Sequence, residues 1–197
     1  MGASFLPDPP ETAAIAAIYE DDARSDGYVM NLVRVWCWRP DMLASFQALR
    51  DDLLAASGLS PREVAVLVVA TAAARGDAYC SLAWGRKLAD LSDDATAADV
   101  LHGRAADLSD REAALAGWAR QVIDDPNATT RADVDGLRRA GFSDREIFEA
   151  TAWIAFRLAF STINDALGAQ PDLQLVESAP PLVREAVTFG RASGPGQ

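Results

Sequence analysis

Histidine is the scarcest chemically versatile residue in this sequence: His102 is the only one among 197 residues. Zinc sites usually draw several ligands from histidine and cysteine, so the sequence excludes a multi-histidine centre and we expect no metal. A serine–histidine or cysteine–histidine couple would have to use His102 itself. That residue precedes Gly103 at the expected end of a helix, where an imidazole can interact with the last carbonyls. His102 is therefore predicted to be structural.

Cysteine is almost as rare, because the chain holds only Cys37 and Cys80. Two cysteines are too few for a disulfide framework and fit a reducing compartment. The first ten residues lack the basic and apolar regions of a signal peptide. The longest apolar stretch, 64–74, is too short to span a bilayer. These absences predict a cytoplasmic protein that has no membrane partner.

Basic residues are outnumbered, with 18 lysines and arginines against 29 acidic residues and a net charge of −11. An acidic surface repels phosphate backbones, so nucleic acid is not an expected partner. The sequence also lacks a phosphate loop, a glycine-rich nucleotide fingerprint and a nucleophile elbow, and no cofactor is predicted. Half of the residues are hydrophobic, which is enough to build a core.

Helix signals dominate what is present. The capping-box pattern Ser-x-x-Glu occurs at Ser60–Glu63, Ser109–Glu112 and Ser143–Glu146. Together with glycines near the expected ends, it predicts an all-α fold. Helices are expected at 10–23, 28–37, 40–56, 61–75, 78–91, 93–103, 110–123, 131–140, 144–167 and 180–189. We expect one domain over 1–190 and a flexible tail at 191–197.

The recurrence of the capping box leaves two interpretations open. The chain is either one bundle with two similar helical halves, or one in which a good helix start simply occurs three times. The apolar run 64–71 could form a buried strand on its β-branched content alone. Its capping box, and its continuation through Ala74, favour a helix buried on nearly every side.

Cys80 is the best candidate for chemistry. Gly76 breaks the preceding helix and Asp77 is a plausible N-cap, which places Cys80 at the third position of the next helix. A helix N-terminus favours a thiolate over a thiol, whereas the charge of Asp77 opposes it, so the sign of the net effect stays open. The alternative is an ordinary buried thiol, since free cysteine is among the most buried residue types.

The stretch from Leu59 to Lys87 resembles the core of the alkylhydroperoxidase D / carboxymuconolactone decarboxylase-like superfamily. Its "uncharacterized peroxidase-related" branch is the most similar, reading Tyr-Cys-Ser-Leu-Ala-His-Gly where this chain has 79–85. Further segments look similar in the same order: 5–10, 27–40, 130–137, 141–148 and 165–168. The resemblance covers most of the chain and implies an AhpD-like helical bundle. It also implies a homo-oligomer that packs through helices such as 144–167; the alternative is that 144–167 is a core helix within one chain.

The chain departs from that family at its catalytic positions. Ala83 replaces the second cysteine, so the family's dithiol cannot form there. Lys87 occupies the position of the relay histidine, and Val68 that of the relay glutamate. The nearest carboxylate, Glu63, is explained by its capping box. Trp84 stands where the similar branch has histidine.

A second histidine of that branch, before an Arg-Pro pair, corresponds to Trp38. Two exchanges to tryptophan suggest that Trp38 and Trp84 share one pocket with more apolar bulk. Tyr79, Glu63 and Lys87 are further candidate residues of this pocket. Cys37 could act as a resolving thiol if its Cα came within about 7 Å of that of Cys80; the alternative is that it fills the core.

These residues support two hypotheses of different classes. The first is a thiol protein that reduces a hydroperoxide through Cys80, with the sulfenic acid resolved by Cys37 or an external thiol donor. The second is a non-redox protein that binds a small apolar or aromatic ligand in a tryptophan-lined pocket. A decarboxylase or lactone-processing enzyme is a third, weaker hypothesis, because no histidine lies near the motif.

Overall fold

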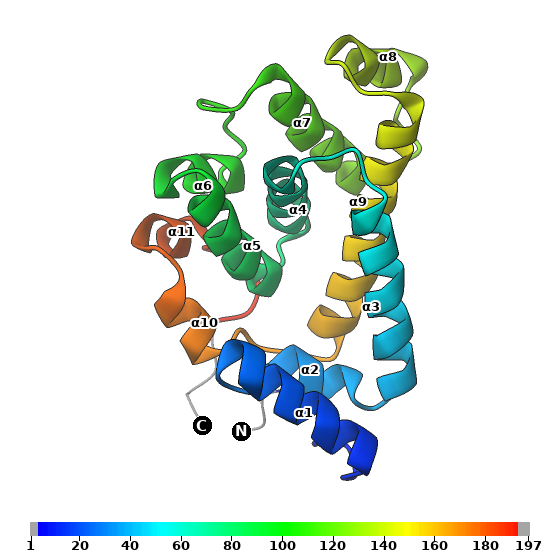
Figure 1. The fold of residues 1–197 in the computed structure, drawn as a ribbon. Coiled ribbons are helices and arrows are strands. Elements are labelled where there is room, and N and C mark those ends of the chain that lie inside the picture. The colour runs from blue at the N-terminus through cyan, green and yellow to red at the C-terminus, as the bar shows by residue number, and fades with distance from the viewer. Residues whose placement is uncertain (1–3, 193–197) are drawn as a thin grey trace.

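The computed structural model describes residues 4–192, and throughout this range the regular elements are α-helices, without a strand (Figure 1). The all-α prediction is confirmed. The helices are α1 (Ala13–Asp26), α2 (Asn31–Trp36), α3 (Pro40–Ala55), α4 (Pro61–Arg75), α5 (Ala78–Leu91), α6 (Asp94–Leu101), α7 (Asp110–Asp124), α8 (Arg131–Arg139), α9 (Asp144–Ala166), α10 (Leu173–Ser178) and α11 (Pro181–Ala186).

Helix α4 forms the centre of the molecule. Figure 1 shows it surrounded by α5, α6, α7 and α9, and it contacts all four. Residues 65–70 of this helix have no exposed surface. The run that could have been a strand is therefore a helix buried on all sides, and burial of its valine and leucine side chains supplies much of the hydrophobic stabilisation.

The predicted capping boxes start α4, α7 and α9. The first two are also joined to each other by reciprocal ion pairs. Arg62 Nε of α4 lies 2.7 Å from Glu112 Oε1 of α7, and Arg111 Nε of α7 lies 2.7 Å from Glu63 Oε1 of α4. Each arginine thus pairs with the capping glutamate of the other helix, which fixes the two N-termini side by side.

Helices α2 and α3 pack against α9 through aromatic side chains. The ring of Trp36 stacks on Phe160 with centroids 5.1 Å apart and lies 5.4 Å from Phe46. Its indole N–H donates to Asn164 Oδ1 over 2.8 Å inside the core. The aromatic cluster therefore joins α2, α3 and α9 into one unit, and Figure 1 shows α3 beside α9.

The chain after α9 returns to α5. Gly85 of α5 contributes to this packing, since a Cβ at that position would lie 2.7 Å from Val183 Cγ1 of α11. Helix α10 was not expected from the sequence. Its N-cap, Asp172, makes no side-chain cap bond, and its carboxylate instead accepts hydrogen bonds from Asn31 N and the Tyr79 hydroxyl. The helix expected at 180–189 is also shorter, ending at Ala186.

The N-terminal helices are shifted relative to the expectation. Thr12 caps α1, so this helix begins at Ala13 and not at residue 10. It runs to Asp26, and Gly27 ends it with a φ of 86°. Helix α2 is shorter than the range 28–37, since Met30 is its N-cap and its N–H donates to Asp22 Oδ2. The expected tail lies mostly outside the described residues; within them, Arg191 donates to the carbonyl of Asp165.

Within residues 4–192, none of the helices combines the length and apolar character needed to cross a bilayer.

Candidate functional site

The N-terminus of α5 places Cys80 as the sequence predicts. Gly76 ends α4 in the left-handed conformation, with a φ of 75°, and Asp77 follows as the N-cap of α5. Asp77 Oδ1 accepts the N–H of Cys80 over 2.9 Å, so Cys80 occupies the third helical position. The residue is 2 % exposed.

Two side chains of α9 complete the surroundings of this thiol. Arg157 Nη2 donates to Cys80 Sγ over 2.8 Å, and the hydroxyl oxygen of Ser161 lies 3.9 Å from the same sulfur. The Ser161 hydroxyl also donates to Asp77 Oδ2. One helical turn separates Arg157 from Ser161, so both project from one face of α9 toward the start of α5. This face carries the groups that can act on the sulfur.

Burial and charge act in opposite directions on Cys80. Burial raises the pKa of the thiol, the Arg157 guanidinium lowers it, and the nearby Asp77 carboxylate raises it again, with the result that the pKa is about 12. Desolvation therefore outweighs the helix N-terminus and the guanidinium. The question that the sequence left open is answered in favour of a protonated resting thiol.

Cys80 lines a cavity of about 200 Å³ between α2, α3, α5 and α9. Apolar and aromatic side chains form most of its walls, and three charged residues, Asp22, Arg50 and Arg157, also reach it. Half of the lining residues are buried, Gln47 is exposed, and the others are half-buried, namely Asp22, Met30, Phe46, Arg50, Ala83 and Trp84. The other lining residues are Met30, Leu32, Val33, Leu43, Phe46, Tyr79 and Phe160.

Trp84 forms part of the cavity wall and is held by its neighbours. Its ring lies 6.4 Å from that of Trp153 in an edge-on arrangement. The Lys87 ammonium lies 4.6 Å and the Arg157 guanidinium 5.6 Å from its centroid, both within cation–π range. The position that holds a relay histidine in the family thus carries a lysine that contacts Trp84.

The structure brings together only some of the predicted site residues. Tyr79, Cys80, Ala83 and Trp84 line the cavity, but Trp38 does not. The Trp38 indole is 43 % exposed and donates to the carbonyl of Pro7. The cavity therefore holds one of the two tryptophans, and the expected pairing of their side chains in it is wrong.

The remaining candidates have structural surroundings. Cys37 is buried and free, does not line the cavity, and has a pKa raised to about 11 by burial. Glu63 accepts from Ser60 N and Arg111, and these bonds hold its pKa below the ordinary value even though burial raises it. His102 is the C-cap of α6, with Nδ1 2.7 Å from the carbonyl oxygen of Ala98. Val68 is fully buried in α4.

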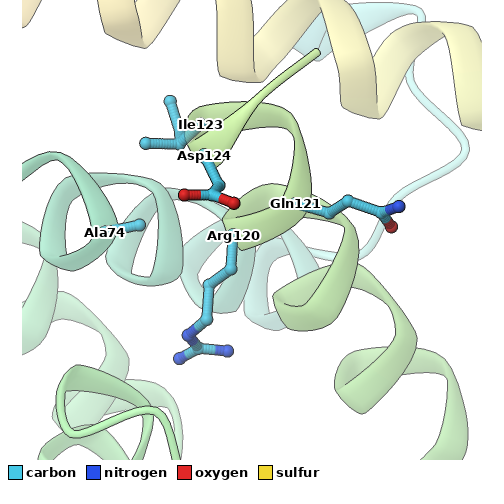
Figure 2. A pocket seen from close by; sticks show the side chains of 5 residues that line it. All are labelled: Ala74, Arg120, Gln121, Ile123 and Asp124. Carbon is cyan, nitrogen blue, oxygen red and sulfur yellow. The ribbon is translucent and has the colours of Figure 1, made fainter. Parts of the chain in front are cut away.

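A second hollow, of about 550 Å³, lies at the C-terminal ends of α4 and α7 (Figure 2). Its arginine, Arg120, donates to the carbonyls of Ala116 and Val100, and burial lowers its pKa. Figure 2 shows that Arg120 and Gln121 point in different directions. Among the described residues, no group of three or more potential ligands could hold a metal ion. The residues that line this hollow include no thiol and no hydroxyl, unlike the surroundings of Cys80.

Comparison with known proteins gives matches at the level of structure. No protein-family model matches the chain, and no curated protein does. A crystal structure described as an alkylhydroperoxidase AhpD core, an uncharacterized peroxidase-related protein from Ralstonia eutropha JMP134, matches with a TM-score of 0.79 and 26% identity, covering 89% of this chain and 95% of that one. An uncharacterized peroxidase-related protein from Silicibacter sp. TM1040 matches with a TM-score of 0.80 and 23% identity, over the same shares of the two chains.

The fold is AhpD-like. The resemblance in the sequence is thereby confirmed at the level of the fold. An AhpD-like fold also occurs in a protein with another activity: the debrominase Bmp8, as a cysteine-to-alanine variant in complex with 2,3,4-tribromopyrrole, matches with a TM-score of 0.72 and 16% identity, covering 88% of this chain and 95% of that one. The AhpD-like architecture therefore does not by itself define the reaction.

Arg157 is not among the site residues expected from the sequence, although a signal for it exists. It lies in the apolar helix α9 four residues after Trp153 and four before Ser161, so all three share one helical face. A charged residue on a face with a tryptophan is unusual, because buried charges are rare unless they are paired. What the spacing could not give is the partner, Cys80, which lies 77 residues earlier.

Proposed function

We propose that this chain is a peroxidase-related thiol protein that reduces a small hydroperoxide through Cys80. The observation that carries the proposal is the contact of the Cys80 sulfur with both the cavity and the Arg157 guanidinium, whose nitrogen lies 2.8 Å away. A buried guanidinium stabilises negative charge on a neighbouring sulfur or oxygen. The AhpD-like fold supports the same class of chemistry.

The proposed step consumes one hydroperoxide for each thiol. Cys80 loses its proton, and the thiolate attacks the terminal peroxide oxygen and breaks the O–O bond. The products are a sulfenic acid on Cys80 and an alkoxide, which takes up the proton to become an alcohol. Sulfur is oxidised and the peroxide is reduced, and Arg157 is placed to stabilise the thiolate before the attack.

An external thiol donor completes the cycle in this proposal. Ala83 takes the place of a second cysteine, and Cys37 does not line the cavity. One small thiol condenses with the sulfenic acid to give a mixed disulfide and water, and a second thiol releases Cys80 as the free thiol. Such a donor fits a reducing compartment such as the cytoplasm.

Turnover with a thiol donor tests the proposal. We expect purified protein to consume cumene hydroperoxide in the presence of dithiothreitol, Cys80→Ser to abolish this consumption, and Cys37→Ala to preserve it. Absence of turnover by the wild-type protein, or turnover that survives Cys80→Ser, would contradict the proposal. Near-ultraviolet circular dichroism of both variants would verify that they fold.

A second candidate function is binding of a small apolar or aromatic ligand without redox chemistry. The aromatic walls formed by Phe46, Trp84 and Phe160 favour it. Bmp8, which shares the fold, is described in complex with a brominated pyrrole. Here we expect ligand-dependent quenching of tryptophan fluorescence that persists in Cys80→Ser and disappears in Trp84→Leu.

A further inference from the structure

Arg157 carries a buried positive charge that no carboxylate neutralises directly. The residue is 6 % exposed, and among residues 4–192 its guanidinium forms no ion pair. Within the same range, its hydrogen bond goes to Cys80 Sγ. Guanidinium offers five N–H donors and stays protonated in proteins, so an isolated one in the interior is costly.

The nearby groups do not supply a counter-anion for Arg157. Asp77 is the closest acidic influence on Cys80, but its two oxygens accept from Cys80 N and the Ser161 hydroxyl, and it makes no ion pair with Arg157. Cys80 itself is a protonated thiol at neutral pH, since burial raises its pKa to about 12. An unneutralised guanidinium therefore faces the cavity.

The rest of the cavity indicates what kind of ligand body would fit beside Arg157. Phe160 lies 5.0 Å from the Arg157 guanidinium, and Trp84 and Phe46 add further ring surface. Apolar cavities of about 150 Å³ bind benzene, so the present volume of about 200 Å³ suits one substituted ring or a short aliphatic chain. Arg50 adds a second guanidinium to the cavity wall, and the Asp22 carboxyl adds a group of opposite charge. Burial raises the pKa of Asp22, which favours its neutral form.

We propose that this cavity binds a small apolar carboxylate, with its carboxylate group on the Arg157 guanidinium and its apolar body against Phe46, Trp84 and Phe160. Planar carboxylates match the donor geometry of guanidinium, which an ammonium group does not reproduce. The inference uses the same cavity as the proposed function and deepens it: the hydroperoxide that Cys80 reduces carries a carboxylate. Binding itself requires no turnover.

Equilibrium binding of benzoate and of its neutral isostere benzamide tests the charge requirement. By isothermal titration calorimetry, we expect the wild-type protein to bind benzoate at least tenfold more tightly than benzamide. Arg157→Met should reduce this preference to about onefold. Equal binding of the two probes by the wild-type protein would overturn the inference, as would a preference that survives in Arg157→Met.

Arg104→Met is the matched control, because it removes the same unit of charge from an exposed site remote from the cavity lining. It should keep the preference for benzoate. Arg157→Met itself should fold, since replacing an unpaired buried charge by an apolar chain of similar length is often neutral or stabilising. Should this variant fail to fold, the comparison of the two probes on wild-type protein still decides the question.

Protection of Cys80 locates the bound probe. Saturating benzoate should slow the alkylation of Cys80 by iodoacetamide at least fivefold, with Cys37 in the same chain as the internal reference. Equal effects on both thiols, or none on Cys80, would place the probe elsewhere and overturn the inference. If benzoate binds as expected but no hydroperoxide is consumed, the peroxidase proposal fails and the carboxylate site stands.

Discussion

Cys80 lies between two opposing influences on its acidity. A helix N-terminus and a guanidinium stabilise its thiolate, while full burial and the Asp77 carboxylate destabilise it. Because burial prevails, the resting sulfur is a weak nucleophile in an apolar cavity. An unreactive thiol that becomes reactive only when deprotonated is protected from adventitious oxidation.

The raised pKa gives a clear pH dependence for Cys80. We expect its rate of alkylation by iodoacetamide to rise about tenfold for each pH unit between pH 7 and pH 10, because the thiolate fraction does so below the pKa. Mass spectrometry of the Cys80 peptide measures this rate. A plateau near pH 8 would contradict the expectation and would mean that Arg157 outweighs burial.

Asp165 provides a second pH-dependent residue. Burial, and to a lesser extent Asp77, raise its pKa to about 6, against Arg75 and Arg191, which lower it. The folded state thus holds the proton more tightly than the unfolded state, and the free energy of unfolding falls as pH rises from about 4 to 6.

Asp165→Asn should remove this dependence. We expect the variant to be more stable than the wild type by about 1 kcal/mol at pH 7, after a discount for solvent screening of a partly exposed group, and equally stable at pH 4. Urea unfolding at both pH values measures this difference. Asp90→Asn, at an exposed position, is the control and should shift neither value.

Single residues also define what the sequence could predict of the site. The capping role of Asp77 and the third position of Cys80 follow from local spacing, and both are confirmed. Arg157 and Ser161 reach the sulfur through the packing of α9 against α5, which depends on the whole fold. The same holds for Trp38, whose exposure no local pattern indicates.

At the scale of helices, the N-termini of α4, α7 and α9 are linked by their capping glutamates. Arg111 is the centre of this link, since it pairs with Glu63 of α4 and Glu146 of α9 and donates to the carbonyl of Gly141. Its guanidinium also lies 3.8 Å from the centroid of Phe142. Charge-assisted bonds to helix N-termini complete the capping and orient neighbouring helices.

Replacing Arg111 should therefore loosen three helices together. We expect Arg111→Gln to lower the free energy of unfolding by about 2 kcal/mol, the scale for bonds to charged groups. Arg138→Gln is the control, because Arg138 also pairs with two carboxylates, Asp135 and Asp144, but at an exposed site. Equal losses in the two variants by urea unfolding would contradict the linking role of Arg111.

The starts of α4, α7 and α9 were predictable because a serine in a capping box precedes each of them. Ser60, Ser109 and Ser143 each accept from the backbone three residues later, and these helices begin where the pattern predicts. Helix α10 lacks such a signal, because the Asp172 side chain bonds to Asn31 and Tyr79 instead of capping. A residue with the right chemistry for a cap was thus committed to tertiary contacts, which sequence alone does not reveal.

Across the whole molecule, the cavity lies where two groups of helices meet. Helix α5 belongs to the group around α4, and α2 and α3 belong to the aromatic cluster on α9 (Figure 1). Helix α9 contacts both α4 and α3 and so belongs to both groups, and its Arg157 reaches Cys80 of α5. Any relative movement of α5 and α9 changes both the cavity and the distance between the sulfur and the guanidinium, so the surroundings of Cys80 depend on how these two helices pack.

Self-association is a prediction at this largest scale. Apolar side chains remain exposed on α3, where Met42 and Leu49 share a face, and on α9, at Phe148 and Leu158. Large exposed apolar residues on neighbouring helices are typical of interaction surfaces.

We expect light scattering after size exclusion to give a mass above the 21.0 kDa of one chain. Leu49→Lys combined with Leu158→Lys should lower it, whereas Leu91→Lys, at an exposed site on α5, should not. A monomeric wild-type protein would contradict the prediction.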